Sequence, residues 1–136
     1  MRRRVFLFAS LAGPLVADVS DQIYNLFISM ATALSGAEPD RFLQAFDHAM
    51  PDYEKLSRYI EAITSQSDIV SSIDILSDEG DEKARTVELD WLLQLTAPLM
   101  PVVRRRQKIK CRVARQGRKW KVVSLDPVEF FAPVRP

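Results

Sequence analysis

The sequence has very little cysteine and histidine, with one of each (Cys111 and His48) in 136 residues. A single cysteine excludes an internal disulfide and a cysteine-rich zinc site. A single histidine excludes metal centres and hydrolytic sites that need several imidazoles, although carboxylate metal sites stay open. Glycine and proline are also scarce, at 4 and 8 residues, which excludes collagen-like and low-complexity sequence.

The residues that are present describe one ordinary globular domain. Hydrophobic residues make up 47% of the chain and charged residues 27%, which excludes disorder and supplies enough apolar side chains for a core. Phosphate-binding loops, nucleophile elbows and dinucleotide fingerprints are absent from the sequence. We therefore expect no metal and no cofactor, and no residue is assigned as catalytic.

The first 17 residues are typical of an export signal. Three arginines at positions 2–4 are followed by a short apolar run over 5–13, and Ala17 is a small residue at a cleavage position. The run is too short to span a bilayer, which takes about 20 apolar residues. We predict a signal peptide over 1–17 and one exported domain, periplasmic or secreted, over 18–136, with no stable membrane span. Two alternatives stay open: an uncleaved N-terminal membrane anchor, and an amphipathic or buried helix of a cytoplasmic protein.

Charge is divided unevenly along the expected mature domain. Residues 18–82 carry 14 acidic and 3 basic side chains, whereas residues 83–136 carry 4 acidic and 13 basic ones. Without the three N-terminal arginines, the formal charge falls from +1 to about −2. An acidic first half and a basic second half therefore belong to one small domain.

Apolar residues recur every three or four positions in the first half, which predicts helices. A first helix is expected from Ser20, whose hydroxyl would cap it, to about Ser35. A short second helix begins near Pro39 and ends before Pro51. A third helix follows and ends near Gln66.

In the second half, the apolar period changes to two, which predicts strands. Alternating segments cover 69–76, 86–95, 104–113 and 120–125, and the short turns between them predict an antiparallel meander. Helices followed by consecutive hairpins predict an α+β fold, with three N-terminal helices packed on a four-stranded antiparallel sheet. Cys111 has apolar neighbours in the third strand and is expected to be buried.

The last hairpin contains a motif that resembles a known superfamily. It reads Gln116-Gly117-Arg118-Lys119-Trp120-Lys121-Val122-Val123. Together with the order of elements over 20–131, it resembles the nuclear transport factor 2-like superfamily, which includes SnoaL-like and ketosteroid isomerase-like domains. The resemblance implies a cone-shaped, cystatin-like fold in which a long first helix and a curved sheet enclose a pocket.

The chain departs from this superfamily in two ways. Members often have a short strand or hairpin between the second and third helices, whereas only residues 48–51 fill that gap here. The catalytic residues of the isomerase branch match no position by motif, so the resemblance implies the fold and the pocket but no catalytic residue. Because many such domains pair through their sheets, it also implies a homodimer through the sheet.

Five aromatic residues are candidates for lining an apolar ligand pocket. The two tryptophans are expected on the apolar face of the sheet, where they can meet aromatic side chains from the helices. The candidates are Phe27, Phe46, Tyr53, Trp91 and Trp120. The alternative is that these large side chains simply fill the core.

Asp47, His48 and Asp52 are the candidates for acid–base chemistry. A carboxylate near an imidazole orients it and stabilises its charge, which is the arrangement of a general-base pair. The alternative is structural: Asp47 and His48 end the second helix and Asp52 caps the third.

Basic side chains occupy every second position of the third strand. A stripe of this kind can bind a polyanion or an anionic membrane surface. It can also remain solvated, dock a second copy, or pair with the neighbouring strand's acids at about 0.2–1 kcal/mol each. Export makes nucleic acid an unexpected partner. The stripe is Arg104, Arg106, Lys108, Lys110 and Arg112, and the neighbouring acids are Glu88 and Asp90.

The leading hypothesis is an exported, non-catalytic module that binds a small apolar ligand or a protein partner. The alternative is a small isomerase-like enzyme that uses a pocket carboxylate for proton transfer on an apolar substrate. An enzyme should hold a carboxylate or His48 inside its pocket, with a shifted pKa. A binding module should keep its acids outside.

Overall fold

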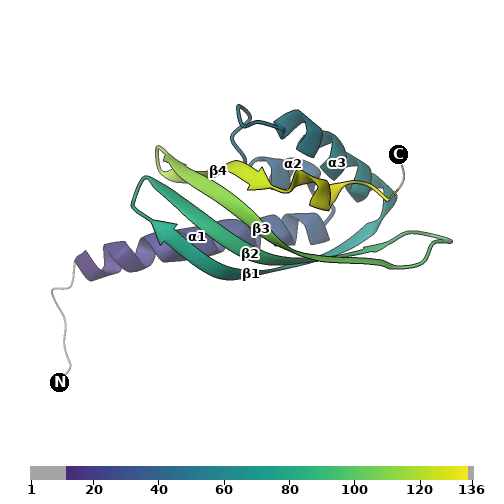
Figure 1. Cartoon of the computed structure of the whole chain (residues 1–136), viewed down its shortest axis with the longest axis horizontal. Coiled ribbons are helices and arrows are strands. Elements are labelled where there is room, and N and C mark those ends of the chain that lie inside the picture. The colour runs from purple at the N-terminus through teal and green to yellow at the C-terminus, as the bar shows by residue number, and fades with distance from the viewer. Residues whose placement is uncertain (1–11, 135–136) are drawn as a thin grey trace, which may run out of the picture.

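The computed structural model describes residues 12–134, with side chains from residue 19. Three helices are followed by four strands and a short 3₁₀ helix (Figure 1). Most of the predicted signal peptide lies outside the described residues. The elements are α1 (Ala12–Ser35), α2 (Pro39–Leu43), α3 (Tyr53–Gln66), β1 (Asp68–Gly80), β2 (Ala84–Thr96), β3 (Val103–Gln116), β4 (Lys119–Asp126) and η1 (Val128–Phe131).

The first helix begins earlier than the sequence predicted. α1 starts at Ala12, so Ser20 lies inside the helix and does not cap it. Pro14 is accommodated because it lies in the first turn, where backbone N–H groups have no partner within the helix. The expected cleavage position after Ala17 therefore falls within α1.

The four strands form one antiparallel sheet in the order β1-β2-β3-β4, which confirms the predicted α+β meander. Ile73 of β1 lies opposite Trp91 of β2, and Trp91 lies opposite Gln107 of β3. The helices cover the inner face of the curved sheet, with α1 packed along β1 (Figure 1). The outer face carries the basic stripe of β3.

Tight turns end the first and third strands. Gly80 has a φ of 144°, and a Cβ there would lie 2.4 Å from the backbone oxygen of Ala84. Position 80 therefore requires glycine, because any other side chain would clash where β1 turns into β2. Gly117, with a φ of 66°, makes the short connection that the sequence predicted between β3 and β4.

Between α2 and α3 the described chain contains no hairpin, as the sequence predicted. One isolated parallel bridge joins Phe46 to Val122 of β4. The N–H of Val122 donates to the carbonyl of Ala45 at 2.8 Å, and the N–H of Asp47 donates to the carbonyl of Val122 at 2.9 Å. This short segment therefore closes the sheet's β4 edge against the helices.

Five aromatic rings fill the middle of the space between sheet and helices, and we call them the aromatic cluster. They are Phe42, Phe46, Trp91, Phe130 and Phe131, all at most 4% exposed. Ring centroids are 5.0 Å apart for Trp91 and Phe131 and 5.2 Å apart for Phe42 and Phe46. Because η1 supplies two of the rings, the C-terminal segment closes one side of the core.

Candidate functional site

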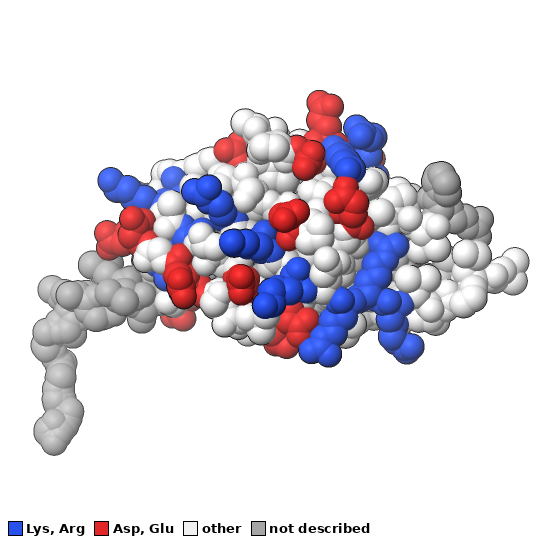
Figure 2. All heavy atoms as spheres, viewed as in Figure 1, with Lys and Arg blue, Asp and Glu red and all other residues white. Residues whose placement is uncertain are grey.

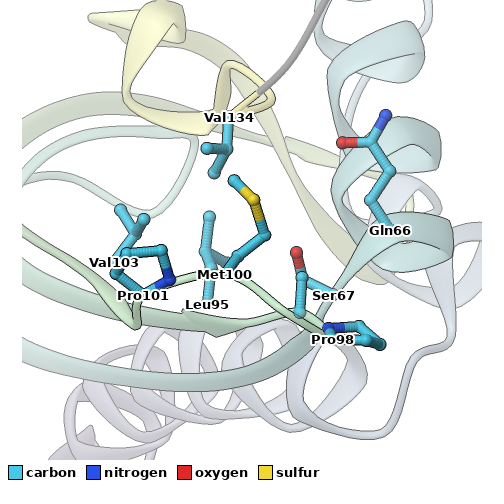
Figure 3. A pocket seen from close by; sticks show the side chains of 9 residues that line it. Gln66, Ser67, Leu95, Pro98, Met100, Pro101, Val103 and Val134 are labelled. Atoms are coloured by element: carbon cyan, nitrogen blue, oxygen red, sulfur yellow. The ribbon is translucent and has the colours of Figure 1, made fainter.

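A hollow of about 340 Å³, which we call the mouth pocket, lies where α3 ends and the β2–β3 loop begins. The C-terminal segment covers it from the other side, so that Met100 points towards Val134 (Figure 3). Its described lining consists of Gln66, Ser67, Leu95, Ala97, Pro98, Met100, Pro101, Val103 and Val134. The volume falls in the range of about 300–1,000 Å³ that is typical of small-ligand sites.

The described lining of the mouth pocket is mostly apolar and carries no charge. Gln66 and Ser67, from the end of α3, supply its polar side chains (Figure 3). None of the described lining residues has a side chain that titrates near neutral pH. The arrangement can exclude water from an apolar molecule and offer it a few hydrogen bonds, but it offers no acid or base.

The five aromatic residues proposed from the sequence do not line the described mouth pocket. Phe27, Phe46 and Trp91 are at most 1% exposed and belong to the core. The indole Nε1 of Trp91 donates to the hydroxyl of Ser71 at 2.8 Å, which satisfies its polar group. Whether these three residues ever contact a ligand stays a prediction.

Trp120 and Tyr53 occupy the edges of the core. Trp120 is buried, and its Nε1 donates to the Gln22 side-chain oxygen of α1 at 2.9 Å. It also lines a shallow groove between α1 and the β3–β4 hairpin. Tyr53 is half-buried, and burial is the main cause that raises its pKa.

Asp47 is held by hydrogen bonds that explain its position structurally. One carboxylate oxygen accepts from the N–H of Ala49 and the other from the side-chain nitrogen of Gln116, each at 2.9 Å. These two bonds, with the backbone bond the larger cause, lower the pKa of Asp47. A carboxylate with a lowered pKa is a weaker base, so this geometry does not prepare Asp47 for proton abstraction.

His48 and Asp52 are placed by the loop between α2 and α3. The exposed His48 ring stacks on Tyr53 with centroids 4.4 Å apart. Asp52 is the N-cap residue of α3, as the sequence alternative proposed, but its side chain makes no capping hydrogen bond to the described helix. None of the three acid–base candidates lines the described mouth pocket.

On the outer face of the sheet, the basic stripe of β3 lies beside an acidic column on β2, formed by Glu88 and Asp90. Glu88 lies opposite Lys110, and Asp90 lies opposite Lys108. The Arg106 guanidinium contacts the Asp90 carboxylate at 2.7 Å, which lowers the pKa of Asp90 and raises that of Arg106. Cross-strand pairing between the two columns is therefore confirmed for Asp90 and Arg106.

The described part of the chain contains neither a cluster of metal-ligand side chains nor a membrane-spanning helix. No group of three His, Cys, Asp or Glu side chains among residues 19–134 is placed to hold a metal ion. In the same part of the chain, no helix is both long and apolar enough to cross a membrane. The thiol of Cys111 is buried, as predicted, and burial raises its pKa far above the ordinary value.

The mouth pocket was not predicted from the sequence, although the sequence contains one signal for it. Residues 97–102 connect two strands and are entirely apolar, in a place where polar turn residues are usual. Pro98 and Pro101 on their own are typical of a turn. An apolar turn of this composition indicates a loop that covers a cavity or contacts a partner.

Comparison with known proteins identifies the fold. No family model matches the chain, and no curated protein matches it. A conserved protein from Planctomyces limnophilus has a TM-score of 0.72 at 12% identity, covering 80% of this chain and 93% of that one. A candidate scytalone dehydratase from Novosphingobium aromaticivorans has a TM-score of 0.71 at 13% identity, covering 80% and 85%. A nuclear transport factor 2-like superfamily protein from Salmonella enterica has a TM-score of 0.68 at 10% identity, covering 81% and 89%.

These neighbours cover most of their own length and most of this chain, so the similarity extends over the whole domain. Their low identity limits the conclusion to architecture. The chain therefore has the nuclear transport factor 2-like fold, with three helices packed on a four-stranded antiparallel sheet.

Proposed function

We propose that this protein is a non-catalytic module that binds a small apolar ligand in the mouth pocket. One observation carries the proposal: the pocket has a volume of about 340 Å³ and an apolar described lining without a titratable side chain. Proton transfer needs an acid or base within hydrogen-bond reach of the substrate. Asp47, His48 and Asp52 are not among the described residues that line this pocket. The geometry therefore favours binding over isomerase chemistry.

Filling the pocket tests the proposal directly. Ala97 lines the hollow, whereas the adjacent Thr96 is exposed and does not line it. Ala97→Phe should reduce binding of the neutral apolar dye phenylnaphthylamine, measured by its fluorescence, by about tenfold or more, because the ring occupies the ligand's volume. Thr96→Phe is the matched control and should bind dye like the unaltered protein. Equal binding by both variants would contradict the proposal.

Two further expectations remain part of the proposal. Export is supported by the arginine-rich start and apolar run at positions 2–13. A homodimer through the outer sheet face is supported by its adjacent acidic and basic columns, since a twofold axis can place each against the other. Native mass spectrometry of the protein, purified after expression of the full chain, measures the processed N-terminus, a retained ligand and the assembly mass together.

A further inference from the structure

The β2–β3 loop, which we call the apolar tip, projects beyond the rest of the domain (Figure 1). Leu99 is fully exposed, and Val102 is about half exposed. Leu99 also has a φ of 63°, in the left-handed region that disfavours residues with a side chain. The left-handed backbone of Leu99 costs stability, and its exposed side chain gains none from burial. An exposed apolar residue held in a strained backbone indicates a surface that contacts another molecule.

Three arginines, at positions 104–106, follow the apolar tip after one intervening valine. Arg104 and Arg106 are exposed on the outer face at the start of β3, while Arg105 faces inward and donates to the carbonyl of Phe130 at 2.8 Å. Arg104 is hydrogen-bonded through Nε to the neutral Gln94 at 3.0 Å, so its charge is not balanced by that partner. Figure 2 shows the basic side chains gathered directly beside the uncharged projecting end. Asp68, opposite Thr96 at the start of β1, is an exposed acid at the same end.

We propose that this end of the domain docks on an anionic membrane surface. A bilayer presents anionic headgroups above an apolar interior. The apolar tip can match the interior, and the adjacent arginines can match the headgroups. Leu99 and Val102 enter the apolar layer, while Arg104 contacts headgroup phosphates. Arg106 is already paired with Asp90 and adds little to this contact.

Membrane docking by the apolar tip does not require a ligand in the mouth pocket. Pro98, Met100 and Pro101 line the pocket, whereas Leu99 and Val102 are not among its described lining residues. The two functions can therefore be tested with different substitutions. Loss of dye binding reports the pocket, and loss of vesicle binding reports the apolar tip.

Vesicle flotation of the full chain is the first test. The vesicles contain phosphatidylcholine alone or equal parts of phosphatidylcholine and phosphatidylglycerol. Leu99→Asn should reduce binding to the anionic vesicles about tenfold, since it removes a leucine side chain from the apolar layer. Asparagine tolerates the left-handed backbone, so the substitution should not harm folding. Arg104→Gln should reduce binding about fivefold, and only with the anionic vesicles.

Matched controls lie elsewhere on the same sheet. Leu76 is an exposed leucine on β1, and Arg112 lies on the same face of β3 as Arg104 but near the strand's other end. Leu76→Asn and Arg112→Gln should leave vesicle binding unchanged. If these controls lose as much binding as the tip variants, general surface properties explain the binding and the proposal is wrong. The proposal is also overturned if the unaltered protein does not bind anionic vesicles.

A fluorophore on the apolar tip supplies a second readout that is independent of how else the chain contacts lipid. Because Cys111 is buried, a thiol-reactive, polarity-sensitive dye can label Leu99→Cys or Leu76→Cys selectively. Anionic vesicles should shift the emission of the dye at position 99 to the blue and leave the dye at position 76 unchanged. A shift at position 99 that instead follows protein concentration without vesicles would identify a contact between copies and overturn the proposal.

Discussion

The inner face of β2 passes through two regions that differ sharply in packing. Trp91 belongs to the aromatic cluster and is completely buried, whereas Leu95, four residues on, lines the mouth pocket. At Trp91 the helices and η1 supply large rings that meet it. At Leu95 none of the described lining residues is aromatic, and the covering segments are a loop and the C-terminal chain. The same apolar face of one strand can therefore be tightly packed at one residue and border a hollow at another.

Shortening Trp91 should have the largest effect. Trp91→Ala removes the central ring of the aromatic cluster and should lower the free energy of unfolding by about 3–5 kcal/mol, measured by urea denaturation. Trp91→Phe keeps most of the ring contacts and loses the hydrogen bond to Ser71. It should therefore retain most of the stability that Trp91→Ala loses.

A small loss of unfolding free energy in Trp91→Ala would contradict the difference in packing between the aromatic cluster and the mouth pocket. If Trp91→Ala costs less than about 1 kcal/mol, the space around this ring is loosely packed, like a partly exposed site. The cluster and the mouth pocket would then not differ in packing, and the predicted pocket around Trp91 would regain support.

Cys111 tests whether the filled region tolerates a buried polar group. Its side chain is completely buried on β3, opposite Val87 of β2 and Leu125 of β4. Cys111→Ser should cost about 1–3 kcal/mol in thermal or urea unfolding, since the serine hydroxyl has no obvious partner among these apolar neighbours. Cys111→Ala, which is apolar and slightly smaller, should cost less than the serine variant. The reverse order would mean that water or a polar group reaches this part of the interior.

The mouth pocket should respond much less than the filled region. Met100 is partly exposed on its wall, and Met100→Ala should change the free energy of unfolding by less than about 1 kcal/mol. Leu93, on β2 between Trp91 and Leu95, is completely buried. Leu93→Ala is therefore the contrasting variant and should cost about 2–5 kcal/mol. Similar losses from the two variants would show that the mouth is packed as tightly as the core.

The sequence predicted the architecture well because periodicity reports which face of an element is apolar. The alternation through Leu89, Trp91 and Leu93 placed β2 correctly on the core. Periodicity does not report how far apart two apolar faces lie. It could therefore not distinguish the filled surroundings of Trp91 from the hollow beside Leu95, which depends on the path of the loop around Met100.

The candidate acid–base residues show the same limit for polar groups. Their proximity in sequence favoured Asp47 and His48 as a pair. Asp47 instead bonds to Gln116, which is 69 residues away in the sequence, and His48 stacks on Tyr53. Such long-range partners are set by the packing of the β3–β4 hairpin against the helices, and a local motif does not contain that information.

The smallest predicted effect concerns Asp47 and depends on pH. Its two hydrogen bonds lower its pKa in the folded protein, so the ionised carboxylate stabilises the fold above the unfolded-state pKa of about 4. That contribution is lost as the pH falls through the lower folded-state value. Asp47→Asn should therefore be slightly less stable than the unaltered protein at neutral pH, and the difference should disappear in acid. Asp52→Asn is the control, because the Asp52 side chain makes no capping bond to the described helix. A stability difference for Asp47→Asn that grows as the pH falls would mean that the carboxyl is held in its protonated form, and would restore Asp47 as a candidate acid.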